Sequence, residues 1–166
     1  MPMVRSRSEA FGRPVVYHSR RPAADVSYRH YPKLLDMARE VDTLIAIIPG
    51  GAETKHMIDA KVLEALGPTG VFINVARGSV VDEKALIEAL RSKKILSVGL
   101  DVFADEPRVP QELIDMDHIV LFPHVASASV HTRRAMGTLV ADNLKAWAEN
   151  RPPLTPVPET PYPSRR

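Results

Sequence analysis

The chain alternates short apolar runs with segments whose apolar residues recur every three or four positions. The clearest run spans residues 43–48, Thr-Leu-Ile-Ala-Ile-Ile, and it ends at Pro49-Gly50-Gly51. An unbroken run of this kind is typical of a strand buried on both faces, as in a parallel sheet. Strands that alternate with helices predict right-handed β-α-β units, and therefore an α/β fold with a mostly parallel sheet.

The same pattern places the other elements between residues 14 and 150. Further strands are predicted at residues 15–18, 71–75, 95–102 and 118–122. Asp59 and Asp82 each precede an apolar stripe of helical spacing, so both are predicted N-caps. Gly67-Pro68 is predicted to end the first of these two helices. Pro32 opens another, shorter helical stretch.

A long helix is predicted near the C-terminal end of the sequence. Its residues at helical spacing are Met136, Leu139, Val140, Asn143, Leu144 and Trp147. Arg151-Pro152-Pro153 ends this helix, and the proline-rich segment that follows is expected to be extended and poorly ordered. The sequence therefore divides into a folded domain over residues 1–150 and a proline-rich tail over residues 151–166.

Composition excludes several kinds of protein. No cysteine occurs among the 166 residues, so disulfides, thiolate catalysis and cysteine-bound metals are excluded. The 22 basic side chains nearly balance the 20 acidic ones, an excess too small to indicate nucleic-acid binding. No apolar run approaches the roughly 20 residues of a membrane span, and the first residues lack the apolar core of a signal peptide. We expect a cytoplasmic protein that binds neither nucleic acid nor membrane, and no metal.

Three ionisable residues lie a few positions beyond successive predicted strands: Arg77, Glu106 and His124. Each alone is more often structural, as a solvated arginine, a turn glutamate before proline, or a hydrogen-bonded histidine. In parallel sheets, however, ligands bind beyond the carboxyl ends of the strands. Three such residues in succession predict a shared functional crevice.

The segments that carry these residues resemble the motifs of a known family. Residues 74–90, Asn-Val-Ala-Arg-Gly-Ser-Val-Val-Asp-Glu-Lys-Ala-Leu-Ile-Glu-Ala-Leu, resemble the signature of the D-isomer-specific 2-hydroxyacid dehydrogenases. Residues 99–107 and Pro123-His124 resemble the next two motifs of that family. Within it the chain is most similar to the glyoxylate/hydroxypyruvate reductases, from about residue 11 to residue 156. The resemblance implies a Rossmann-like, doubly wound NAD(P)-binding domain over residues 1–150.

The resemblance also implies an oxidoreductase that reduces a small 2-oxo acid to a 2-hydroxy acid. Its implied catalytic residues are Arg77, Glu106 and His124, and Asp101 is implied to hold the nicotinamide carboxamide. The implied cofactor-binding residues at these motifs and at the end of the 43–48 strand are Pro49, Thr54, Val75, Ala76, Arg77, Asp101, His124 and Ala126. One departure is Ala126-Ser127, because the family commonly has glycine at the first of these positions.

The chemistry of the side chains agrees with those roles. Histidine can exchange a proton near neutral pH because its ordinary pKa is about 6.5. A neighbouring carboxylate such as Glu106 favours the imidazolium form and orients the ring. The planar guanidinium of an arginine such as Arg77 pairs with carboxylate and carbonyl oxygens and stays protonated.

The loop after the 15–18 strand indicates which nucleotide binds. In this fold an acidic residue at that point binds the ribose 2′-hydroxyl of NAD, whereas arginine accommodates the 2′-phosphate of NADP. The chain has Ser19-Arg20-Arg21 there, with no acid before Asp25. The alternative is a pair of solvated loop arginines. We expect NADP(H) to be preferred, with NAD(H) possible.

The glycine-rich Gly-x-Gly-x-x-Gly loop of this fold is absent from the 166 residues. We therefore expect part of a longer, homodimeric enzyme, without its first strand, its glycine-rich loop and its substrate domain. With residues 15–18, 43–48 and 71–75 taken as the second, third and fourth strands, we expect either a gap in the sheet or pairing of the second with the fourth. We also expect residues 1–166 alone to be inactive.

Two other functions stay open. One is a non-catalytic remnant that binds a nucleotide and regulates, as some relatives act as nucleotide-sensing corepressors. The other is an inert fragment, whether from a truncated gene, a misassigned start or a deliberate truncation. The complete set of Arg77, Glu106 and His124 favours the reductase, because a binding module does not require it.

Overall fold

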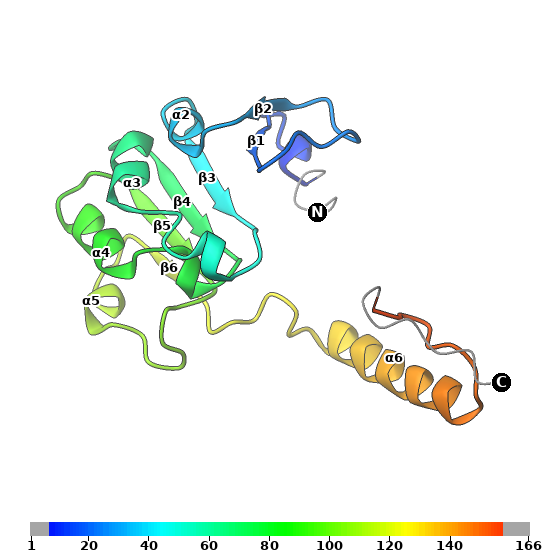
Figure 1. Ribbon diagram of the computed structural model, residues 1–166. Coiled ribbons are helices and arrows are strands. Elements are labelled where there is room, and N and C mark those ends of the chain that lie inside the picture. Colours follow the sequence, from blue (N-terminus) through cyan, green and yellow to red (C-terminus); the bar gives the residue numbers. More distant parts are fainter. Residues whose placement is uncertain (1–6, 158–166) are drawn as a thin grey trace. The chain divides into compact units, whose positions relative to one another are not determined.

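The computed structural model describes residues 7–157 (Figure 1). It forms two compact units, one up to Pro123 and one from His124 onward. The first unit holds every strand of the described chain, and the second holds one long helix.

A four-stranded parallel sheet forms the centre of the first unit. Its strands, in spatial order, are β3 (Thr43–Ala46), β4 (Val71–Asn74), β5 (Ser97–Leu100) and β6 (Val120–Leu121). Alternate residues are buried, so Leu44, Phe72 and Val98 pair with one another across β3, β4 and β5 inside the core. The prediction of a parallel sheet is confirmed.

The prediction that the 43–48 run is buried on both faces is wrong in part. Leu44 and Ala46 are buried, but Thr43 is exposed and Ile45 is only half-buried. The central strands β4 and β5 alternate in the same way, with Ile73 and Gly99 only half-buried, so one face of the whole sheet is less covered within the first unit.

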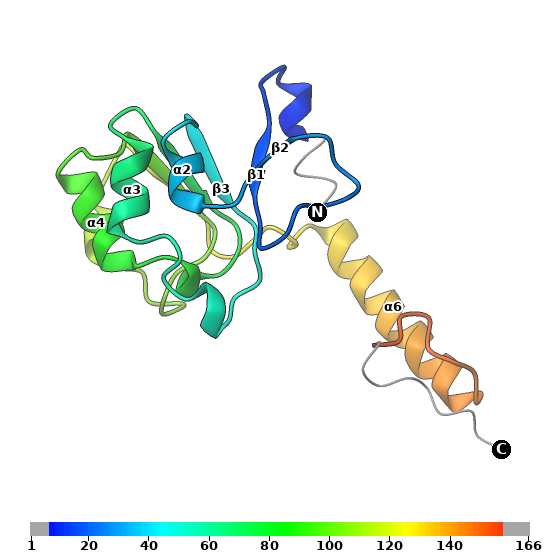
Figure 2. The ribbon, with the colours of Figure 1, turned by 45° about the horizontal axis from the view of Figure 1, so that its top comes forward.

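Helices α3 (Ala60–Leu66) and α4 (Glu83–Arg91) begin where the sequence predicts. The Asp59 carboxylate accepts from the backbone N–H groups of Lys61 and Val62, both at 3.0 Å. The Asp82 carboxylate accepts from the Ala85 N–H at 3.1 Å. Each side chain thereby satisfies donors that the first turn of a helix leaves free. Figure 2 shows these two helices beside α2 (Leu34–Ala38), and α3 contacts both of the others.

The first unit also contains a separate two-stranded parallel sheet. Strand β1 (Val16–His18) pairs with β2 (Arg29–Tyr31), and His18 lies opposite Tyr31. The predicted strand numbering is therefore wrong at one point. In the doubly wound order, β2 takes the third position, and the 43–48 run takes the fourth rather than the third. Arg-His-Tyr contains no apolar run, so periodicity gave no signal for β2.

This corrected order places the expected gap. The doubly wound order 3-2-1-4-5-6 puts its first strand between the second and the fourth, which are β1 and β3 here. The described sheets separate at that point, β2-β1 on one side and β3-β4-β5-β6 on the other. The alternative expectation, that the second strand pairs with the 71–75 strand, is wrong, since β4 pairs with β3 and β5.

A small charged cluster connects β2 to the end of α2. The Tyr31 hydroxyl donates to Glu40 Oε2 at 2.6 Å, and Arg29 donates to the same oxygen at 2.9 Å. The Arg29 guanidinium also lies 4.4 Å from the centre of the Tyr31 ring. The hydrogen bond from Tyr31, with the charge of Arg29, lowers the pKa of Glu40 below its ordinary value, and the same bond raises the pKa of Tyr31.

The second unit is built on α6 (Val130–Ala148), whose first turn is capped by the Ser129 hydroxyl. The predicted helix is confirmed, but the large apolar side chains along it are exposed in the described unit, and only Ala146 is buried. The described tail, residues 151–157, turns back along α6, and Asn143 hydrogen-bonds Thr155 (Figure 1). No helix in residues 7–157 is long and apolar enough to cross a membrane. Residues 158–166 of the predicted tail lie outside the described range.

Candidate active site

The carboxyl ends of β3, β4 and β5 lie next to one another at one edge of the sheet. The ladder continues past the strands, where Val75 N–H donates to Ala46 at 3.2 Å and Asp101 N–H donates to Asn74 at 3.0 Å. An open hollow lies at this edge. It is lined by Ile47, Ile48, Pro49, Gly50, Val75, Ala76 and Arg77. Four of the residues predicted to bind the cofactor, Pro49, Val75, Ala76 and Arg77, therefore lie at the edge where this fold places ligands.

Buried Asn74 shapes the turn that carries Arg77. Its side chain is 1% exposed, its Oδ1 accepts from the Ala76 N–H at 3.0 Å, and its Nδ2 donates to the Arg77 carbonyl at 3.1 Å. The amide thus bridges the Ala76 N–H and the Arg77 carbonyl across this turn. Arg77 itself is exposed, and its guanidinium donates to the Ala76 carbonyl at 2.6 Å.

Two glycines let neighbouring segments approach this turn. A Cβ on Gly50 would lie 2.9 Å from Cγ of Arg77, so the loop after β3 packs directly on the arginine side chain. A Cβ on Gly78 would lie 1.9 Å from the Phe103 carbonyl oxygen. Only glycine permits this backbone contact, which fixes the turn after β4 against the loop after β5.

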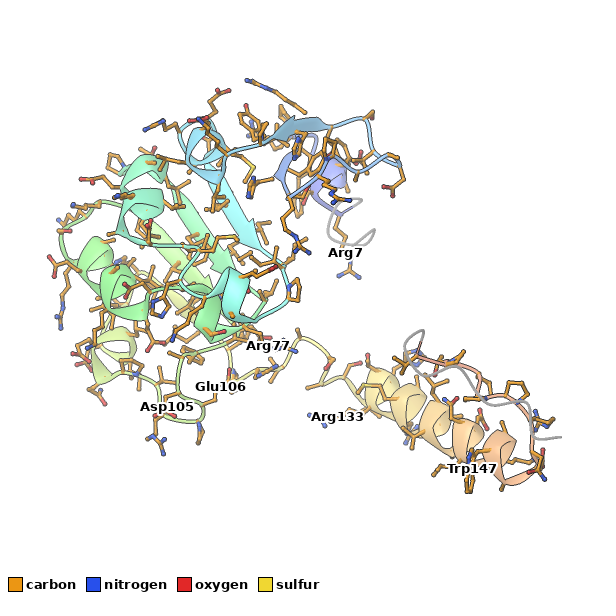
Figure 3. The ribbon with its side chains drawn as sticks, in the orientation of Figure 1. Arg7, Arg77, Asp105, Glu106, Arg133 and Trp147 are labelled. Carbon is orange, nitrogen blue, oxygen red and sulfur yellow. The ribbon has the colours of Figure 1, made fainter. Side chains whose placement is uncertain are left out.

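Glu106 lies on that second loop. Its Oε1 accepts from the Phe103 N–H at 3.0 Å, and Glu83 of α4 accepts from the Ala104 N–H at 3.1 Å. Because Phe103 also touches Gly78, the Arg77 turn and the Glu106 loop form one packed unit. Figure 3 shows Arg77 and Glu106 at the same edge of the first unit. Asp101 begins the loop and is 6% exposed.

The loop after β1 is more open. Ser19 donates to the Arg21 carbonyl at 2.6 Å, and His30 of β2 hydrogen-bonds the Ser19 carbonyl at 3.0 Å. Arg20 donates to Glu53 at 2.7 Å, with exposed fractions of 86% and 78% for the two side chains. Glu53 belongs to the short η1 helix (Ala52–Thr54), and the Thr54 hydroxyl donates to the Pro49 carbonyl at 2.8 Å.

These contacts connect most of the predicted cofactor residues in the first unit. Pro49, Val75, Ala76 and Arg77 line one hollow, Thr54 bonds to Pro49, and Arg20 reaches the Thr54 turn through Glu53. The exposed guanidiniums of Arg20 and Arg21 follow β1, and the exposed side chain of Val75 lies at the hollow. This combination fits a dinucleotide that carries a ribose phosphate.

His124 and Ala126 lie in the second unit, at its beginning, and both are exposed. His124 has φ of +55°, a left-handed conformation that is uncommon for a side chain other than glycine. Such backbone positions concentrate at functional sites, which agrees with the predicted role of this residue.

Four residues at this edge were not predicted: Asn74, Gly50, Gly78 and Glu53. A signal existed for Asn74, because a polar residue that closes an apolar strand is commonly hydrogen-bonded inside the fold. The two glycines lie beside predicted site residues, but only the packing shows what they contact. Glu53 is 33 positions from Arg20, and no local pattern relates the two.

A parallel sheet with capped helices and an open edge beyond its strands defines a nucleotide-binding domain of the doubly wound class. The chain belongs to the D-isomer specific 2-hydroxyacid dehydrogenases, since the model of the family's NAD binding domain matches residues 3–126. The prediction of this family and fold is confirmed.

Several of the relatives are named as reductases. Glyoxylate/hydroxypyruvate reductase A of Arabidopsis thaliana is 44% identical over 154 residues, which cover 93% of this chain and 49% of that protein. Hydroxyphenylpyruvate reductase of Plectranthus scutellarioides is 43% identical over the same length. The NADPH-dependent glyoxylate/hydroxypyruvate reductase of Sinorhizobium meliloti, solved with NADP and malonate, is 52% identical with a TM-score of 0.92, over 98% of this chain and 51% of that one. The chain thus spans about half the length of these relatives.

Proposed function

We propose that this chain is the cofactor-binding part of an NADP(H)-dependent reductase that converts glyoxylate, hydroxypyruvate or a similar small 2-oxo acid to the 2-hydroxy acid. The observation that carries the proposal is the Arg77 turn, which holds a guanidinium beside an open hollow at the ligand-binding edge of the sheet. The reductases among its relatives support the reaction.

Arg77, Glu106 and His124 are the proposed catalytic residues, an assignment that rests on the three motifs and their order along the chain. A bound reduced nicotinamide supplies the hydride of such a reaction. Arg77 pairs with the substrate carboxylate and carbonyl oxygens through its planar fork. His124 delivers the proton to the carbonyl oxygen, and Glu106 favours the imidazolium that carries it.

NADP(H) is the proposed preferred nucleotide, with NAD(H) as a weaker alternative. Ser19, Arg20 and Arg21 follow β1 without an acidic residue, and the Sinorhizobium meliloti relative is described as NADPH-dependent. A guanidinium binds a 2′-phosphate, whereas a carboxylate there repels it.

The proposal is tested by measuring the reduction of glyoxylate and hydroxypyruvate with NADPH and with NADH, in the protein that carries this chain. A higher kcat/KM with NADPH is expected. Equal use of the two nucleotides would overturn the preference, and no turnover of either acid would overturn the reaction.

Replacing Glu106 with Gln tests the proposed proton donor. The neutral amide no longer favours the imidazolium, so the pH above which reduction slows should move to lower values. The pH dependence of kcat/KM measures this shift, and a Glu88→Gln variant on the exposed side of α4 provides the control. An unchanged profile in Glu106→Gln would refute the pairing of Glu106 with His124.

We further infer that residues 1–166 by themselves do not reduce 2-oxo acids, because they contain no glycine-rich loop to bind the pyrophosphate. The resemblance also supports a homodimer for the protein that carries the chain. Turnover by the purified 166-residue polypeptide, at a rate comparable to that of an intact reductase, would contradict the first inference.

A further inference from the structure

The proposed phosphate ligand Arg20 already has an acidic partner in this structure. Its Nη1 lies 2.7 Å from Oε2 of Glu53, a residue 33 positions further along the chain. A carboxylate and a phosphate would bind the same guanidinium through the same N–H donors. Glu53 therefore competes for the group that is proposed to select the nucleotide.

Both backbones at this ion pair are held in place. On the Glu53 side, Thr54 N–H donates to the Gly51 carbonyl at 3.2 Å, and the Thr54 hydroxyl donates to Pro49. Two residues further, His56 N–H donates to the Ser79 carbonyl at 2.9 Å, beside the Arg77 turn. On the Arg20 side, the bond between His30 and the Ser19 carbonyl anchors the loop to β2. The carboxylate is thus presented to Arg20 by a fixed turn.

We infer that Glu53 is a specificity-determining residue, which lowers the affinity for NADP(H) by holding Arg20 and leaves the affinity for NAD(H) unchanged. The inference rests on the proposed role of Arg20 in the preference for NADP(H). A phosphomonoester carries a charge of about −1.5 to −2 near neutral pH, so it is also repelled by a carboxylate beside its ligand. The ribose 2′-hydroxyl of NAD(H) has no such charge and does not require the guanidinium.

The exposure of the pair decides the size of the effect. The two side chains are 86% and 78% exposed, so water screens them and their attraction contributes little to folding. Removing Glu53 should therefore leave the fold unchanged and release Arg20. The expected gain in NADPH affinity is about two- to fivefold, the range of an exposed ion pair.

The test uses the protein that carries this chain and measures the dissociation constants of NADPH and NADH for four forms of it: the wild type, Glu53→Gln, Arg20→Gln and the double variant. Glu53→Gln should bind NADPH about two- to fivefold more tightly and NADH equally well. Arg20→Gln should weaken the binding of NADPH. In the double variant the gain in NADPH affinity from Glu53→Gln should disappear, since the two residues act through one contact. Higher salt should reduce the gain.

Glu64→Gln is the matched control. Glu64 is another exposed glutamate of the first unit, and it pairs with Lys94 at 2.9 Å, with exposed fractions of 64% and 47%. The Glu64→Gln substitution removes the same charge from the same unit, and Glu64 does not pair with Arg20. Its affinities for both nucleotides should equal those of the wild type.

The outcomes separate the two claims. If Arg20→Gln binds NADPH as well as the wild type does, the proposed role of Arg20 in the preference is wrong, and the role of Glu53 is wrong with it. If Arg20→Gln weakens NADPH binding but Glu53→Gln does not strengthen it, the role of Arg20 stands and Glu53 does not determine specificity. A decrease in NADPH affinity in Glu53→Gln would show that Glu53 positions Arg20 instead, and an equal gain for NADH would indicate a general charge effect; either result overturns the inference.

Discussion

The turn after β4 and the loop after β1 each present an arginine with a proposed role, but they hold it in different ways. The Arg77 turn is fixed from inside by the buried amide of Asn74 and by the close contact of Gly78 with Phe103. The Arg20 loop is exposed, and its guanidinium is held by one surface ion pair.

The difference matches the two proposed roles, since one arginine must be held in a defined position and the other must only attract a charged group. A group that acts on a reacting bond must be positioned within a fraction of an ångström, which buried hydrogen bonds and close packing provide. A group that selects a nucleotide by charge acts at longer range and tolerates a mobile side chain. Substitutions at the buried contacts of the first region, such as Gly78, should therefore disturb folding, whereas substitutions in the second should change binding alone.

Gly78→Ala should cause the largest loss of stability. The added Cβ would lie 1.9 Å from the Phe103 carbonyl oxygen and 2.5 Å from the Ala104 nitrogen, and neither backbone atom can move freely. We expect the free energy of unfolding to fall by about 3 kcal/mol, at the upper end of overpacking effects.

Gly137→Ala is the control for this substitution. Gly137 lies in α6, where an added Cβ meets nothing within 4 Å, so the variant should be as stable as the wild type or more stable. Chemical denaturation measures both variants. Wild-type stability in Gly78→Ala would show that the turn after β4 is not fixed by this contact.

Arg20→Asp should leave folding intact and weaken binding. The substitution replaces a phosphate ligand with a repelling charge, so the affinity for NADPH should fall by about 1 to 3 kcal/mol. Titration with NADPH and NADH, together with a denaturation curve, measures both effects. A loss of stability as large as that of Gly78→Ala would remove the distinction between the two regions.

The smallest effect is a loss of stability of the β1–β2 sheet at acidic pH. The pKa of Glu40 is lowered in the folded protein, chiefly by the hydrogen bond from Tyr31, so the charged carboxylate stabilises the fold. This contribution is fully present above the ordinary pKa of about 4.5 and is lost as the pH falls through the lowered value. The protection of β2 amides from hydrogen exchange should therefore decrease below pH 4.5 relative to that of β4.

In Glu40→Gln this additional decrease should be absent, because the amide does not titrate. The same additional decrease in the variant would assign it to another group.

The sequence predicts those elements whose signals are local. Asp59 and Asp82 were recognised as caps because each combines a side chain that accepts N–H groups with an apolar stripe at helical spacing. Strand β2 and the single-turn helix α5 (Gln111–Ile114) were not recognised, because neither contains an apolar run. The structure of β2 depends on its pairing with β1, in which His18 lies opposite Tyr31.

The candidate site divides in the same way. Arg77 and Glu106 follow apolar runs and belong to family motifs, so both could be placed beyond their strands in advance. The contact of Gly78 with Phe103 and the pairing of Arg20 with Glu53 join separate loops, and only the folded chain brings them together. Neither contact has a local pattern that would predict it.

The central claim is that Arg77 acts on the substrate and Arg20 on the nucleotide. The most direct test is the steady-state reduction of glyoxylate by Arg77→Gln in the protein that carries this chain, with NADPH binding measured in parallel. The account predicts that kcat/KM for glyoxylate falls about 100-fold or more, as when a donor to a developing oxyanion is removed, and that this loss is far larger than any weakening of NADPH binding. Wild-type kcat/KM, or a loss explained entirely by weaker NADPH binding, would contradict it.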